Sequence, residues 1–555
     1  MSHTSFKTWF KSGSPWIWWN AAAVTVSLIM VFGLLALIAV RGMGNYWPAN
    51  IEQWQIKEAD GKQATIVGEI WDKELVSAVT LKESGVQVPP GQDHFTRYLL
   101  KVGNRDLLGS DFHLILEYQI ESRSQPDDLV VIERREWGNA YGRLRKLMEK
   151  GQVIATGDKL TAEVAVRVAR AVSLYDQIHE IEKDDIGAIN YSLERLRLKQ
   201  RRYELDGELT KQRQAEIKKE QTELKAEYAQ LQQSLVKLYQ DIKRDQLVIE
   251  SMDGRTMTIS LDKIVNVRHP NRMSLLDKLG VYFKNIGAFV SEDPREANTE
   301  GGVFPAIFGT VMMVMLMAVL VTPLGVVAAV YLREYAKQGF IIRTIRIAVN
   351  NLAGVPSIVY GVFGLGFFVY FLGGNIDRLF FPEAAPAPVF GTPGLLWSSL
   401  TLALLTLPVV IVATEEGLSR IPRSIREGSL ALGATRFETL WRTIIPMASP
   451  AIMTGLILAI ARAAGEVAPL MLVGVVKLAP SLPLDGNAPF LHLDRKFMHL
   501  GFHIYDVGFQ SPNVEAARPL VYATALLLVL VIVALNLTAI GIRNHLREKY
   551  RSLES

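Results

Sequence analysis

The sequence predicts an α-helical integral membrane protein with about six transmembrane helices and an extramembrane domain of mixed α and β structure. Three observations support this prediction. The 555 residues are 49% hydrophobic, and the apolar residues are concentrated in blocks long enough to cross a bilayer. The region 42–300 contains no such block and alternates short β-like runs with turn signals over 45–172. Within the same region, residues 175–246 are rich in Glu, Lys, Gln and Leu and contain almost no helix-breaking residues.

The spans are assigned first, because a transmembrane helix needs roughly 20 mostly apolar residues. Six blocks qualify, at about 20–40, 303–331, 354–372, 393–414, 448–474 and 517–541. The first is too long and too apolar for a signal peptide, and the sequence RGMGNYW that follows it lacks a small-x-small cleavage site. We therefore expect a retained first helix over 20–41, anchored by the tryptophans at 16, 18 and 19.

The distribution of basic residues predicts the orientation. Lys and Arg gather before the first span, between spans two and three, between spans four and five, and after span six. By the positive-inside rule these segments are cytoplasmic, including the N-terminus 1–19 and the tail 546–555, and the domain 42–300 lies outside. A net charge of +4 is small for this length and does not favour a nucleic-acid binder.

The helical segment 175–246 is predicted to be either a long coiled coil or a hairpin of two helices that turns at Gly207. It is interpreted either as a solvated spacer arm or as a docking surface for a partner. The apolar segment 273–290 carries a few charges and is expected to lie along the membrane surface before span two.

No catalytic constellation is recognisable in the sequence. The chain has no cysteine and no G-x-x-x-x-G-K-[ST] phosphate loop, so we expect no ATP site and no cofactor bound by this chain. His492, His499 and His503 lie in one outer loop, where solvated side chains are expected rather than a metal site. Glu415 and Glu416 are expected to flank the inner end of span four.

Span five contains two charges inside an apolar run, Arg462 and Glu466. Their i, i+4 spacing places them on one helix face, where they can pair. A charge at the centre of a spanning helix costs about 2.5–3.5 kcal/mol on insertion scales. Such residues therefore indicate either a structural ion pair or a functional site. One interpretation is a buried ion pair that fixes helix packing; the other is a polar site on a substrate path, where a guanidinium suits a phosphate-like anion. Gly465 and Pro469 are expected to allow close approach and a kink.

The connection 415–446 is charged and has helical periodicity. Apolar residues recur on one predicted stripe, with a bend at Gly433 and an end to the helical pattern at Pro446; the stripe comprises Leu430, Ala434, Phe437, Leu440, Trp441 and Ile444. Such a helix suits either a groove on a soluble partner or the lipid surface.

The segment REGSLALGATRFETLWRTIIP resembles the cytoplasmic coupling motif of ABC importer permeases, E-A-A, three residues, G, nine residues, I-x-L-P. Glu427, Gly433 and Pro446 match at these spacings, whereas Gly428, Ser429, Thr443 and Ile445 depart from the motif. The resemblance implies the type I permease fold over 301–545. It also implies that 415–446, including Phe437 and Trp441, docks on a separate ATPase subunit, which would bind ATP and Mg²⁺.

Four further segments resemble the PstA type of phosphate permease: GGVFPAIFGT, LAGVPSIVYGVFGLG, ARAAGEVAPL and the stretch 518–550. This resemblance covers about 300–550. It implies import of phosphate with a PstC-like permease, a PstB-like ATPase dimer and a PstS-like periplasmic phosphate-binding protein. Arg462 and Glu466, and less strongly Arg420, are then expected along the substrate path.

Two alternatives remain open at this point. A permease for another oxyanion, such as molybdate or sulfate, has the same general features. A membrane phosphate sensor would need a cytoplasmic output domain, whereas the basic cytoplasmic segments of this chain are all short.

Overall fold

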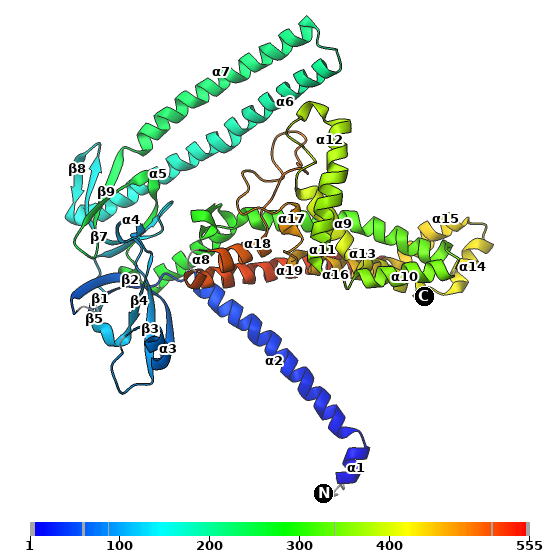
Figure 1. Cartoon of the computed structure of the whole chain (residues 1–555), viewed down its shortest axis with the longest axis horizontal. Coiled ribbons are helices and arrows are strands. Elements are labelled where there is room, and N and C mark those ends of the chain that lie inside the picture. The colour runs from blue at the N-terminus through cyan, green and yellow to red at the C-terminus, as the bar shows by residue number, and fades with distance from the viewer. Residues whose placement is uncertain (1–5, 58–60, 87, 338, 512–513, 551–555) are drawn as a thin grey trace.

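The structure is a computed structural model that describes residues 6–57, 61–86, 88–337, 339–511 and 514–550. Its membrane half is a bundle of long helices, and its outer half is an α+β domain with a projecting helical hairpin (Figure 1). The predicted cytoplasmic segments 1–19 and 546–555 lie partly outside the described residues.

Six helices of the described chain are long and apolar enough to cross a membrane. They span Ser14–Gly44, Phe304–Tyr335, Ser357–Phe380, Leu395–Arg420, Arg436–Gly465 and Ala517–Glu548. Each overlaps one predicted block, because length and hydropathy alone determine which segments can be buried in a bilayer. The fifth begins earlier and ends earlier than the predicted 448–474.

The helices of the membrane half pack around α13 (Leu395–Arg420), which is the most buried of the six candidates. It lies between α9 (Phe304–Val330) and α16 (Ile445–Gly465), whereas α19 (Val514–Tyr550) packs on α16. The shorter helices of this half are α10 (Phe340–Leu352), α11 (Ser357–Phe363), α12 (Gly374–Phe380), α14 (Arg423–Ala431), α15 (Arg436–Thr439), α17 (Leu470–Val473) and α18 (Leu500–Tyr505).

The first helix, α2 (Ser14–Gly44), follows the short α1 (Phe6–Lys11) and diverges from the bundle along most of its length (Figure 1). Its C-terminal end meets α19, where a Cβ on Gly42 would lie 2.9 Å from the carbonyl oxygen of Tyr522. Glycine at this position therefore allows the two helices to touch. Most apolar side chains of α2 are exposed, as expected for a helix that faces lipid or another membrane protein.

The outer domain contains two antiparallel sheets. One has the order β4-β3-β2-β1-β5 and the other β10-β9-β7-β6-β11, with β8 paired to β7. The strands are β1 (Ile51–Lys57), β2 (Gln63–Ser77), β3 (His94–Lys101), β4 (Phe112–Leu116), β5 (Ile120–Ser124), β6 (Leu129–Arg134), β7 (Ala140–Glu149), β8 (Gln152–Thr156), β9 (Asp245–Glu250), β10 (Thr256–Ser260) and β11 (Ile264–Arg268). Helices α3 (Ala78–Glu83) and α4 (Arg105–Leu108) connect strands of the first sheet, and α5 (Leu160–Glu180) covers the second sheet.

The segment 175–246 forms a hairpin of α6 (Ile186–Leu205) and α7 (Lys211–Ile242), so the two-helix prediction is confirmed over the single long helix. Gly207, in the turn between them, has a φ of 68°, which favours glycine. The base of the hairpin reaches the membrane half, because the Tyr191 hydroxyl donates a 2.8 Å hydrogen bond to the Ala488 carbonyl.

The two ends of the outer domain lie next to each other. Tyr46, just after α2, packs its ring 5.2 Å from that of Phe289 on α8 (Leu275–Ser291), and Asn285 donates to the Tyr46 carbonyl at 3.0 Å. The short pair β12 (Pro294–Arg295) and β13 (Glu300–Gly301) then leads into α9. Helix α8 leaves Leu275, Leu276 and Phe283 exposed, as expected for an amphipathic helix at a membrane surface.

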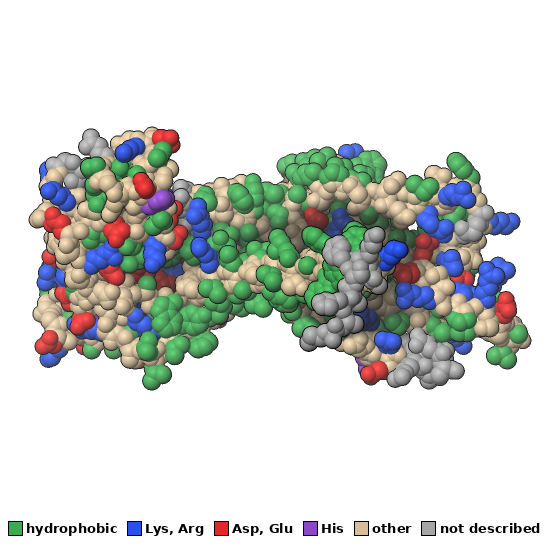
Figure 2. Space-filling model, turned by 90° about the horizontal axis from the view of Figure 1, so that it is seen from below, with side chains coloured by type: hydrophobic (Ala, Val, Ile, Leu, Met, Phe, Trp, Pro, Cys, Tyr) green, Lys and Arg blue, Asp and Glu red, His purple; other side chains and the backbone are tan. Residues whose placement is uncertain are grey.

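The surface follows the same division along the long axis. Figure 2 shows an apolar band between two ends that carry charged side chains, with Lys and Arg concentrated at the end of α14 and α15. The two charged ends of the molecule are therefore suited to water, and the apolar band between them is suited to lipid.

Candidate functional site

Arg462 lies near mid-depth in the bundle. Helices α13 and α16 are antiparallel, and a Cβ on Gly417 would approach Ala451 while one on Gly455 would approach Ala413. Each step along α16 thus corresponds to one step back along α13. Continuing this register places Arg462 level with Thr406, close to the middle of α13.

Arg462 and Glu466 come together, although not on one helix as the spacing predicted. Helix α16 ends at Gly465, and Glu466 has extended backbone angles. The reason is Pro469, which has no N–H and restricts the residue before it, so the helix ends upstream instead of kinking. The Arg462 Nε and Glu466 Oε1 atoms are 3.7 Å apart, and the side chains are 33% and 21% exposed.

The break after Gly465 creates a packing site for α11. A Cβ on Gly361 would lie 2.7 Å from the Cα of Pro469, so the two backbones meet closely there. The next residue back, Tyr360, donates its hydroxyl to the Leu352 carbonyl at 2.6 Å and interacts electrostatically with Arg462. Tyr360 is a neighbour of the charged pair that sequence spacing alone did not reveal.

Arg420 is not part of this arrangement. It is the last residue of α13, it is exposed, and it pairs with Glu416 one turn earlier. Fourteen residues of helix separate it from the level of Arg462, which is roughly 20 Å at 1.5 Å per residue. Glu415 has a separate partner, Arg346 on α10, at 3.2 Å. The two carboxylates therefore face different cations.

The connection 415–446 forms two short helices and a bend. Gly433 has a φ of 90°, which only glycine adopts without strain, and separates α14 from α15. Thr435 caps α15 together with Glu438 in a reciprocal capping box. Helix α14 is fastened to the bundle by Arg426, which donates to the Leu418 and Ile421 carbonyls and pairs with Glu334 at 2.9 Å.

The predicted single apolar stripe is wrong. Leu440 and Ile444 are buried against the bundle, whereas Phe437 and Trp441 are 66% and 64% exposed and stack with a ring separation of 6.3 Å. The apolar residues of this segment therefore form two faces. Leu440 and Ile444 pack against the bundle, whereas Phe437 and Trp441 point outward. Glu427 is exposed.

Pro446 does not end the helical pattern either. A π-helical turn over 440–444 joins α15 to α16, and Pro446 lies in the first turn of α16. The wider turn accommodates a residue without an N–H, so the fifth span continues into the coupling segment as one helix. Helices α15 and α16 therefore form one continuous helical segment.

The expectation that the loop histidines are solvated is wrong. His492, His499 and His503 are all buried. His492 bonds Asp485 at 2.9 Å, and His499 Nδ1 accepts from the Gly501 N–H. In the described part of the chain, no group of three His, Cys, Asp or Glu side chains is placed to hold a metal ion.

Burial lowers the pKa of His499 and of His503 to about 4. Both histidines are therefore neutral in the folded protein. The free energy of unfolding is expected to fall as the pH drops from the ordinary histidine pKa of 6.5 toward 4. The loss is at most about 3 kcal/mol per histidine, and it levels off below pH 4. Thermal unfolding of the detergent-solubilised protein between pH 8 and 4.5 measures this. A His499→Gln, His503→Gln variant with an unchanged pH dependence would contradict it.

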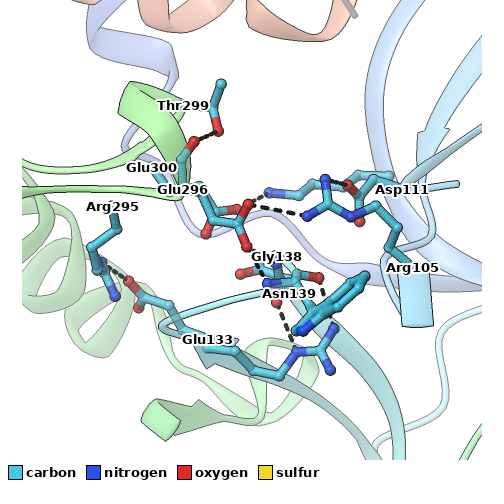
Figure 3. A network of polar contacts seen from close by, with 12 residues as sticks. Arg105, Asp111, Glu133, Gly138, Asn139, Arg295, Glu296, Thr299 and Glu300 are labelled. Atoms are coloured by element: carbon cyan, nitrogen blue, oxygen red, sulfur yellow. Dashed lines mark hydrogen bonds and ion pairs between the residues drawn. The ribbon is translucent and has the colours of Figure 1, made fainter. Parts of the chain in front are cut away.

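A second polar cluster joins the outer domain to the segment that precedes α9 (Figure 3). One Glu296 oxygen accepts from the Trp137 and Gly138 N–H groups, and the other accepts from Arg105 at 3.0 Å. Glu296 has a φ of 44° and Trp137 a φ of 70°, both in the left-handed region. The polar contacts hold this strained backbone in place.

The same segment contacts the membrane half on its other side. Asn298 donates to the Lys477 carbonyl at 2.8 Å, and the Lys477 ammonium lies 3.0 Å from the buried Asp506. Arg295 is held by Glu133 at 2.6 Å (Figure 3). Segment 294–301 therefore links the outer domain to the loops between spans five and six. No sequence pattern had indicated it.

Replacing Glu296 with alanine is expected to loosen this junction, because three donors lose one carboxylate. Trp137 and Arg105 are accessible to water, so the net loss is about 0.5–1.5 kcal/mol rather than the full cost of buried unpaired donors. Hydrogen exchange of 294–301 should become faster by a corresponding factor. Glu136→Ala is the matched control, since Glu136 makes an exposed pair with Lys263 that should contribute little. Equal exchange in both variants would contradict the assignment.

Comparison with known proteins places the chain in a family. Residues 321–552 match the family described as binding-protein-dependent transport system inner membrane component. The chain is 38% identical over 247 residues to the protein named phosphate transport system permease protein PstA 1 of Mycobacterium tuberculosis (strain CDC 1551 / Oshkosh), covering 44% of this chain and 71% of that protein.

A probable phosphate transport system permease protein PstA of Methanocaldococcus jannaschii is 31% identical over 241 residues, covering 43% of this chain and 74% of that protein. An inward-facing structure of the MetNI methionine ABC transporter aligns with a TM-score of 0.32 and 18% identity, over 43% of this chain and 94% of that one. From these sequence identities, the chain belongs to the PstA family of ABC transporter permeases.

Proposed function

We propose that this chain is the permease subunit through which an ABC importer moves inorganic phosphate across the inner membrane. The protein is a multi-pass membrane permease and not an enzyme, and its family membership is the observation that carries the phosphate assignment. The exposed Phe437 and Trp441 pair supports a separate ATPase as the energy source, because a stacked aromatic pair at one polar end of the bundle suits a groove on a soluble partner.

The proposed assembly contains a PstC-like permease, two PstB-like ATPase subunits that bind ATP and Mg²⁺, and a PstS-like binding protein outside. Both termini and the segment 415–446 are cytoplasmic in this assembly. The concentration of Lys and Arg at that end of the bundle supports this orientation (Figure 2).

Transport would proceed by alternating access. Motion of the ATPase subunits displaces α14 and α15, and the continuous helix from Arg436 to Gly465 carries that motion to mid-depth. Arg462 meets the phosphate there, because its guanidinium offers paired donors to the anion's oxygens. Glu466 competes for the same guanidinium and keeps the capture of phosphate weak enough for release.

Reconstitution with the co-expressed partners tests this function. We expect a complex with a PstC-like permease and an ATPase that hydrolyses ATP faster when phosphate-loaded binding protein is added, and proteoliposomes that accumulate phosphate. Molybdate and sulfate serve as competitors. Failure to recover any ATPase, or stronger stimulation by either competitor, would overturn the assignment.

A further inference from the structure

A cavity of about 290 Å³ lies where α2, α19 and the outer domain meet, away from the coupling segment and from Arg462. Its walls come from the end of α2, the linker after it, strand β2 and the first turns of α19. The lining residues used below are Arg41, Trp47, Glu69, Trp71, Asp72 and Arg518.

Two arginines on different spans line this cavity. The Arg41 guanidinium lies over the Tyr522 ring, 5.9 Å from its centroid, and the contact of Gly42 with the Tyr522 backbone fixes α2 against α19 at this level. Arg518 is one turn before Tyr522 on α19, so both residues occupy the same helix face. Two guanidinium groups at one cavity are suited to the oxygens of a phosphate.

The opposite wall carries carboxylates and aromatic rings. Asp72 of β2 brings a carboxylate to the cavity, whereas the carboxylate of Glu69 interacts with Lys101 and Tyr141, so the cavity as a whole is suited to a group that carries both signs. Trp47 and Trp71 supply flat apolar surfaces with a polar edge, a side-chain type that is enriched at membrane–water interfaces.

The cavity lies at the outer surface of the bilayer. The exposed apolar surface of α2 lies next to the cavity. The ring of Trp47 lies 5.9 Å from that of Tyr282 on the amphipathic helix α8. A neighbouring cavity shares Trp47, Ala49 and Ile70 and adds Lys278 to the lining. In Figure 1, α2, α8 and α19 converge beside the outer domain at this level. Acyl chains attached to a bound headgroup would lie along α2.

We propose that this cavity binds the headgroup of a membrane phospholipid that carries a phosphate and a primary amine, as phosphatidylethanolamine does. Arg41 and Arg518 bind the phosphate, and Asp72 accepts from the ammonium. Free inorganic phosphate shares the oxyanion chemistry, but it has no cation to match the Asp72 carboxylate and no apolar part to match the surroundings. The bound lipid would hold α2 against the outer domain.

Native mass spectrometry of the full chain, released from membranes that contain phosphatidylethanolamine and phosphatidylglycerol, tests the proposal. We expect retained phosphatidylethanolamine in the wild type and at least about tenfold less in Arg41→Gln, Arg518→Gln, since two charge-assisted contacts are lost. The matched control is Arg197→Gln, Arg201→Gln on the hairpin, where both arginines are similarly exposed. Equal retention in all three proteins would overturn the site.

Two further measurements distinguish a bound lipid from free phosphate. The first uses a variant that retains both arginines, so its result does not depend on the folding of the double variant. Asp72→Asn keeps both arginines, and its lipid preference is expected to shift toward phosphatidylglycerol; an unshifted preference would overturn the role of the Asp72 carboxylate. Millimolar inorganic phosphate should leave the retained lipid in place. Displacement of the lipid by phosphate would assign the cavity to the free anion instead.

Discussion

Arg462→Gln is expected to lower the rate of phosphate uptake roughly 10- to 100-fold while the protein still inserts into the membrane. The guanidinium lies near mid-depth and is one-third exposed, so it is accessible to a passing anion. Losing a charged hydrogen-bond partner for that anion costs about 1.5–3 kcal/mol. Initial uptake rates in proteoliposomes measure the effect, and Arg462→Lys should retain part of the activity because it keeps the charge without the paired donors.

The companion variant separates a transport role from a packing role. Glu466→Gln should lower the phosphate concentration for half-maximal uptake and also the maximal rate, because the competing carboxylate charge is gone. Arg378→Gln, at an exposed position of α12, is the control and should transport normally. If Arg462→Gln transports phosphate at the normal rate, the pair only fixes helix packing.

Phe437→Ala, Trp441→Ala is expected to abolish recovery of the ATPase with the permease while leaving the permease folded. Exposed aromatic side chains at the centre of an interface commonly contribute 2 kcal/mol or more each, so removing both weakens binding by about three orders of magnitude. Co-purification and phosphate-dependent ATP hydrolysis are the measurements. Ser424→Ala, an exposed position on α14, provides the control. An intact complex in the double variant would show that the ATPase docks elsewhere.

The positions of the six candidate spans were predictable because they depend on composition over long windows. Six apolar blocks and the motif around Glu427 and Gly433 identified the fold class, and the hairpin turn at Gly207 followed from a single glycine in a long helical pattern. These features are local in sequence, so no knowledge of packing is needed to find them.

The remaining features depend on contacts between distant segments. The end of α16 at Gly465 follows from Pro469 together with its close approach to Gly361, which the sequence does not show. Leu440 and Phe437 have similar hydropathy, and only the position of the bundle decides which is buried. Glu296 has no sequence signal at all, because an acidic residue in the left-handed region is held there by donors from Arg105 and Trp137.

The adjacency of Tyr46 and Phe289 has a consequence for the modular history of the chain. An insertion whose two ends touch can be gained or lost without moving the helices on either side. The similarity to PstA relatives, which covers less than half of this chain, is compatible with a core permease that acquired a separable outer module. Joining residue 47 to residue 282 through a short Gly-Ser linker should therefore give a chain that still inserts all six spans; a chain that is degraded instead would show that the module is required for assembly.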